Sequence, residues 1–298
     1  MYSVVLTFFK EVLMDYLKSF REMISLRGLT DHTVKSYSTY LKKYLFYLDE
    51  ILHISPEEAT WDDMRSFVLW LETECSLSDR TINAAISQLR FFTLYILHKP
   101  WDPYQIPMRK FNTYMPFVPT REEVRIFLSS FTDLKQKAML VLMYSAGLRV
   151  GEVCNLRYED ISRSQMRIHI RQTKNRSDRF AILSETALQI LTDYWFTYGK
   201  PTGYLFPKQN GKDLPIDTFY IARHMAEQEK VLGWPHRFTC HSLRHAFGTH
   251  LYESGTDLLT LQALLGHKSI QSTTIYVHLA ASTLKNTISP LDTLGVLS

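Results

Sequence analysis

The chain has 298 residues, of which 45% are hydrophobic, and its formal net charge at pH 7 is +4. This composition excludes a disordered chain, and the length is sufficient for two domains that each bury a core. The mildly basic balance permits a nucleic-acid partner without requiring one.

Cysteine usage and the N-terminus bear on the compartment. Cys75, Cys154 and Cys240 lie far apart and form no CxxC pair, which indicates a reducing environment and neither a disulfide framework nor a zinc site. The apolar run 4–9 is too short to span a membrane and lacks both a basic leader and a small-residue cleavage site. We therefore expect a cytoplasmic protein that does not associate with a membrane.

The first 98 residues have helical periodicity and no strand pattern, which predicts a four-helix domain over 1–98. The helix expected at 31–50 has a polar face that is either solvated or in contact with DNA phosphates or bases. The candidate DNA-binding residues are Lys35, Ser36, Thr39, Lys42 and Lys43 on this face, together with Arg90 in the helix expected at 79–97.

The segment 99–118 is rich in proline and contains the basic residues Lys99, Arg109 and Lys110. Proline interrupts helices and stiffens an extended chain, so this segment is predicted to be a linker between two domains. Such a linker suits a chain that passes along DNA, and it equally suits any connection between domains.

The second domain is predicted over 119–298 and is mixed α/β, with many helices and few strands. Alternating residues at 166–170 and 179–183 predict an antiparallel β hairpin with Lys174 near its tip. The chain therefore belongs to a mainly α class with one small antiparallel hairpin or sheet. The tail beyond Ala280 either docks on a neighbouring subunit or frays.

A helix expected at 241–254 places polar groups on one face. His241, Arg244 and His245 share that face, whereas His250 falls on the opposite, buried stripe. His241 and His245 have the spacing of a metal-chelating pair, but Ser242 stands where a zinc protease has glutamate, so no metal site is predicted.

Further candidates flank glycines. Arg149 lies between Gly147 and Gly151, where a backbone can approach a ligand, and its guanidinium matches a phosphate. Gly266 ends a helix just before His267, and Tyr276 follows on a short helix. The apolar stripe of that helix is expected at Ile270, Thr273, Thr274 and Val277, with Tyr276 beside it.

Together these motifs resemble the tyrosine recombinases, the phage-integrase family that includes Xer-type resolvases. The resemblance extends from about residue 10 to 280, and the N-terminal half resembles the family's SAM-like core-binding domain. The residues that carry it are Gly147-Leu148-Arg149-Val150-Gly151-Glu152, Lys174, His241-Ser242-Leu243-Arg244-His245, Leu265-Gly266-His267 and Tyr276.

The resemblance implies a role for each residue. Tyr276 attacks a DNA phosphodiester and forms a 3′-phosphotyrosyl bond, so neither ATP nor a metal or other cofactor is needed. The other roles are phosphate binding by Arg149, Arg244 and His267, acceptance of the tyrosine proton by His241, protonation of the 5′-oxygen by Lys174 and orientation of the site by Glu152. Because Lys174 lacks the flanking glycines common in the family, Arg171 and Arg176 are alternatives for the proton donor.

The resemblance also implies the partners and the assembly. These are double-stranded DNA with a specific core site, a homotetramer that passes through a Holliday junction, and possible accessory factors. Tyr276 is expected to act in its own subunit. Two other functions are a type IB topoisomerase-like relaxing enzyme, which the recombinase-like N-terminal half disfavours, and a non-catalytic DNA-binding regulator, which the complete set of site residues disfavours.

Overall fold

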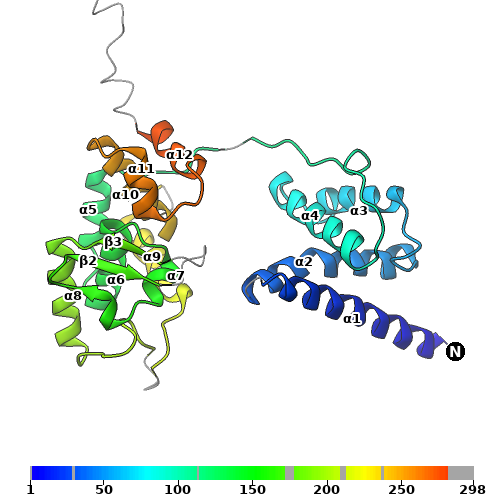
Figure 1. The fold of residues 1–298 in the computed structure, drawn as a ribbon, viewed down its shortest axis with the longest axis horizontal. Helices are drawn as coiled ribbons and strands as arrows, with labels where there is room; N and C mark the ends of the chain where they lie inside the picture. Colours follow the sequence, from blue (N-terminus) through cyan, green and yellow to red (C-terminus); the bar gives the residue numbers. More distant parts are fainter. Residues whose placement is uncertain are drawn as a thin grey trace, which may run out of the picture. The chain divides into compact units, whose positions relative to one another are not determined.

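A computed structural model describes residues 2–28, 31–112, 114–171, 178–208, 213–235 and 238–280. The chain divides into two compact units, Met1–Thr113 and Tyr114–Ser298 (Figure 1). Lys174, Arg176 and the tail beyond Ala280 lie outside the described residues. Among the helices that are described, none is both long and apolar enough to cross a membrane.

The N-terminal unit is helical, as the periodicity predicted. Its core is aromatic, and Phe20, Tyr44, Phe67 and Phe92 are fully buried there. Thr60 begins one helix with a capping box, in which its side chain and that of Asp63 satisfy each other's backbone N–H groups. The elements are α1 (Tyr2–Leu26), α2 (Asp31–Tyr47), the π-helical turn η1 (Leu48–Leu52), α3 (Trp61–Thr73) and α4 (Asp79–Tyr95).

A buried glutamine joins α2 to α4. The backbone N–H of Tyr40 donates to Oε1 of Gln88 at 3.0 Å, and Nε2 of Gln88 donates to the carbonyl of Ser36 at 3.3 Å. Gln88 is only 4% exposed. Its amide therefore fixes the packing of the two helices that carry the candidate DNA-binding residues.

The first part of the proline-rich segment packs on the N-terminal unit. Ile106 is buried in the core of that unit. Arg109 forms ion pairs with Glu72 at 2.7 Å and Asp79 at 3.1 Å, and its backbone exchanges two hydrogen bonds with Asn83. Residues 99–110 are thus held by α3 and α4, and the boundary between the two compact units falls at residue 113.

The C-terminal unit combines helices with a three-stranded antiparallel sheet in the order β1-β2-β3. Strand β2 pairs with β3 in the register Ile168 opposite Ala181, which confirms the antiparallel pairing of the two predicted strands. The short strand β1 was not predicted. The elements are α5 (Arg121–Ser129), α6 (Leu134–Ser145), α7 (Val150–Cys154), η2 (Tyr158–Asp160), β1 (Ile161–Ser162), β2 (Arg167–Ile170), β3 (Arg179–Ile182), α8 (Glu185–Thr197), α9 (Thr218–Leu232), α10 (Cys240–Glu253), α11 (Leu258–Leu265) and α12 (Gln271–Leu279).

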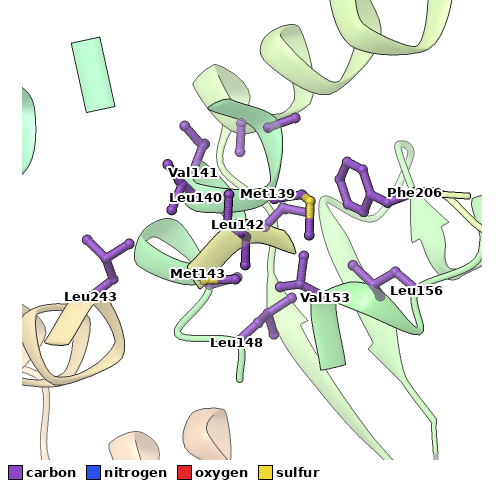
Figure 2. Close-up of a cluster of buried hydrophobic side chains, with 14 of the residues drawn as sticks. Met139, Leu140, Val141, Leu142, Met143, Leu148, Val153, Leu156, Phe206 and Leu243 are labelled. Atoms are coloured by element: carbon purple, nitrogen blue, oxygen red, sulfur yellow. The ribbon is translucent and has the colours of Figure 1, made fainter. Parts of the chain in front are cut away.

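The core of this unit surrounds α6. Figure 2 shows buried side chains of α6 together with three fully buried neighbours, Leu148, Val153 and Leu243. Leu148 immediately precedes Arg149, and Leu243 immediately precedes Arg244. Burial of these leucines anchors the backbone at both arginines. The last three helices, α10 to α12, contact one another (Figure 1).

The hydrogen bonds of Gln88 should contribute to the free energy of unfolding of the N-terminal unit. Gln88→Met keeps the side-chain length but leaves the backbone N–H of Tyr40 and the carbonyl of Ser36 without their amide partner, and we expect a loss of about 1–2 kcal/mol in the free energy of unfolding. Urea unfolding monitored by fluorescence measures this loss. The same substitution at the exposed Gln189 is the control and should change stability by less than about 0.5 kcal/mol. Equal effects of the two substitutions would contradict the role of Gln88.

Candidate active site

Arg149 is held at the start of α7 by Glu152. Arg149 is the N-cap residue of this helix, and its backbone N–H donates to Oε2 of Glu152 at 2.9 Å. Its Nη1 donates to Oε1 of the same carboxylate at 2.9 Å, while the side chain keeps 25% of its surface exposed. A glutamate three residues after the cap thus fixes both the helix end and the guanidinium.

A second arginine, from β3, holds the other side of this carboxylate. Arg179 donates from Nη1 and Nη2 to the two oxygens of Glu152 at 2.8 and 2.9 Å, and from Nε to the carbonyl of Leu264 at 3.0 Å. Arg179 is not among the site residues predicted from the sequence. One pattern in the sequence points to it: Arg179 lies two residues before the buried Ala181, so both side chains lie on the same face of β3.

Arg244 on α10 is buried. Its Nη1 donates to the carbonyl of Gly147 at 2.5 Å, and its Nη2 donates to the carbonyl of Leu265 at 2.6 Å and to Nε2 of His267 at 3.1 Å. Burial, and then the positive charge of Arg149, lower the pKa of Arg244 to about 10. It still carries its charge at neutral pH.

His267 follows the left-handed Gly266 that ends α11. Because an arginine can only donate, Nε2 of His267 accepts from Arg244, and the ring proton lies on Nδ1, 2.9 Å from the hydroxyl of Thr273. Burial, followed by the charges of Arg244 and Arg149, lowers the pKa of His267 to about 4. His267 is therefore neutral at pH 7.

Tyr276 lies against α10 of its own chain. It is 1% exposed, and its ring is nearly parallel to that of His267 with centroids 6.3 Å apart. The prediction that Tyr276 lies beside the buried stripe was wrong, because the buried face of α12 consists of Thr273 and Tyr276. Gly248 provides the space, since a Cβ there would lie 2.4 Å from the tyrosine ring. Burial raises the pKa of Tyr276, and Arg244 and Arg149 oppose that rise.

The other histidines of α10 differ in position. His241 is exposed at the start of the helix, and its pKa is lowered by partial burial and then by Arg244 and Arg149. The ring of His245 lies near those of His241 and Tyr276, with centroid distances of 6.5 and 6.2 Å. The prediction that His250 is a core residue is confirmed: it is 7% exposed, with Nδ1 3.0 Å from the hydroxyl of Tyr144.

The hairpin alternative Arg171 is held by carboxylates. It pairs with Asp160 at 2.6 Å and Glu159 at 2.9 Å. The hydrogen bond and charge of Asp160 raise the pKa of Arg171, which makes Arg171 a weaker proton donor. Over the described parts of the chain, no group of three or more histidine, cysteine, aspartate or glutamate side chains is placed to hold a metal ion.

The candidate DNA-binding residues lie on the N-terminal unit, and five of the six are exposed: Lys35, Ser36, Thr39 and Lys42 on α2, and Arg90 on α4. Lys43 differs, because it is half-buried with Nζ 3.8 Å from the Cys75 sulfur and above the ring of Trp70. Its ammonium group is engaged within its own unit.

Comparison with known proteins identifies the family. Residues 120–283, more than half of the chain, match the model described as the phage integrase family. The chain belongs to that family. Residues 16–103 match its N-terminal SAM-like domain. The chain is thus a tyrosine recombinase, an enzyme of site-specific recombination that cleaves and rejoins DNA.

Individual relatives agree. A putative integrase/recombinase of Sinorhizobium fredii, y4qK, is 35% identical over 80% of this chain and 78% of its own length. The tyrosine recombinase XerA of Pyrococcus horikoshii is 31% identical over 92% of each chain. The structure of the XerH recombinase bound to a palindromic difH substrate has the same fold, with a TM-score of 0.70 and 20% identity over 87% of this chain and 80% of that one.

Two neutral histidines predict how the stability of this tyrosine recombinase depends on pH. His250 and His267 both have a pKa of about 4, below the ordinary value of 6.5. For His250, burial is the main cause, followed by the charge of Arg121. Below about pH 6.5 the unfolded chain takes up protons that the folded chain excludes, so stability present above that pH is lost as the pH falls toward 4.

Urea unfolding of the full chain at pH 7.0 and 5.5 measures this loss. We expect the wild type to be less stable at pH 5.5, and His250→Gln to show a smaller difference because one titrating group is gone. Equal stability at the two pH values, or an unchanged difference in His250→Gln, would contradict the assignment.

Proposed function

We propose that Tyr276 is the nucleophile that attacks a DNA phosphodiester, forming a 3′-phosphotyrosyl bond and releasing a 5′-hydroxyl. The observation that carries this proposal is the convergence of Arg149, Arg244, His267 and Tyr276 within one chain. At neutral pH only about one tyrosine in a thousand is ionised, so a tyrosine nucleophile needs a proton acceptor and a cationic phosphate site. Arg149, Arg244 and His267 supply the cationic phosphate site, and His241, on the same helix as Arg244, is the proposed proton acceptor.

The arginines bind the phosphate. Arg149 and Arg244 donate to its non-bridging oxygens and stabilise the additional negative charge of the transition state. Three of the five N–H groups of Arg244 donate to the carbonyls of Gly147 and Leu265 and to His267, which leaves one on Nη1 and one on Nε for a phosphate. The neutral Nε2 of His267 must gain a proton before it donates to the phosphate. The negative charge of DNA favours that proton uptake.

Proton transfer involves two further residues. His241 accepts the tyrosine proton; partial burial and the charges of Arg244 and Arg149 lower its pKa, which favours the neutral form that a base requires. Lys174 protonates the 5′-oxygen. The carboxylate partners of Arg171 support Lys174 over Arg171 for this role. Glu152 orients Arg149, and no metal or other cofactor takes part.

The biological unit is a homotetramer on two double-stranded DNA core sites, in the cytoplasm, with recombination of the Xer-like kind through a Holliday junction. The exposed residues Lys35, Ser36, Thr39, Lys42 and Arg90 contact DNA, whereas Lys43 does so only after leaving Trp70 and Cys75. The DNA-bound relative XerH supports the DNA partner.

A covalent adduct tests the nucleophile. The wild type, incubated with a nicked core site from its native flanking DNA, is expected to yield a protein–DNA adduct that survives denaturation and forms in EDTA. Tyr276→Phe should abolish the adduct because the attacking oxygen is gone. The matched control is Tyr252→Phe on α10, which should form it normally. An adduct in Tyr276→Phe would refute the assignment, and strict metal dependence would refute the proposed chemistry.

A further inference from the structure

We propose that Arg179 is a positioning residue of the recombination reaction. It neutralises the carboxylate of Glu152, so that this carboxylate does not compete with the scissile phosphate for Arg149 and Arg244. This inference rests on the proposed function. It assigns a role to a residue outside the set that the sequence motifs identified.

The first support is the complete occupation of one carboxylate. Oε1 of Glu152 accepts from Nη1 of Arg149 and Nη1 of Arg179, and Oε2 accepts from the backbone N–H of Arg149 and Nη2 of Arg179, all at 2.8–2.9 Å. The side chains of Glu152 and Arg179 are only 9% and 8% exposed, so water screens this pair little. Arg179 therefore takes half of the hydrogen-bonding capacity of Glu152.

The second support is the charge balance. Three positive charges, from Arg149, Arg179 and Arg244, surround the single negative charge of Glu152. Burial raises the pKa of Glu152, but Arg179 and then Arg149 outweigh burial and lower that pKa. Without Arg179, the ionised carboxylate would have only Arg149, at 2.9 Å, and Arg244, at 3.9 Å, as cationic partners. It would then compete with the phosphate for both arginines.

The third support is the place of Arg179 in the fold. Its Nε donates to the carbonyl of Leu264 in the last turn of α11, and a Cβ on Gly266 would lie 2.7 Å from its Cδ. One side chain thus connects β3, the start of α7 at Arg149 and the end of α11 just before His267. Glycine at 266 allows the backbone to approach the arginine this closely.

The test compares Arg179→Met with Arg179→Met/Glu152→Gln. Adduct formation is measured in a single turnover on the nicked site at saturating protein, with DNA affinity measured separately. We expect Arg179→Met to slow adduct formation by about 100-fold with little change in affinity. The added Glu152→Gln should restore at least about tenfold, because it removes the competing charge. A residue needed only for packing would not show this rescue, since the second substitution removes a further contact.

Arg125→Met is the control. Arg125 on α5 also pairs with a carboxylate, that of Glu122, and has no place among the proposed site residues, so its loss should change the rate by less than about threefold. An Arg179→Met rate near that of the wild type, or no rescue by Glu152→Gln, would overturn the proposal. If Arg179→Met does not fold, Arg179→Gln takes its place in the same comparison, and failure of both to fold would overturn the proposal in favour of a purely structural role. Absence of an adduct in the wild type would instead refute the proposed function.

Discussion

The active site depends on the carboxylate of Glu152. Isolated in the interior, this charge would be strongly unfavourable, and three buried or half-buried guanidinium groups close together would repel one another. Placed between Arg149 and Arg179 and 3.9 Å from Arg244, the carboxylate stabilises all three. The cluster keeps an excess of positive charge, which is the property that a phosphate-binding site requires.

The hydrophobic core determines where those charges stand. Leu148 and Leu243 are buried directly beside Arg149 and Arg244 in sequence, so core packing fixes the backbone from which each guanidinium extends. On the other side of the site, Gly248 admits the ring of Tyr276 against α10, and Thr273 on α12 orients His267. Packing and electrostatics thus act on the same few backbone positions.

Much of this organisation could be predicted from the sequence, because helical periodicity and the short motifs around Arg149, Arg244, His267 and Tyr276 are local signals. The features that escaped prediction depend on contacts between distant segments. Arg179 joins Glu152 across 27 positions of the chain, the burial of Tyr276 depends on Gly248 of another helix, and residues 99–110 are held by ion pairs of Arg109 with α3 and α4. No local pattern encodes such pairings.

The central claim is that one chain supplies the complete site, and mixing two inactive variants tests it most directly. Arg149→Ala keeps the tyrosine but lacks a phosphate ligand, and Tyr276→Phe keeps the phosphate site but lacks the nucleophile. If Tyr276 acts in its own subunit, a mixture of the two on the nicked site forms no more adduct than either variant alone. Restored adduct carried by the Arg149→Ala chain would show that the tyrosine acts in a neighbouring subunit and would contradict the account.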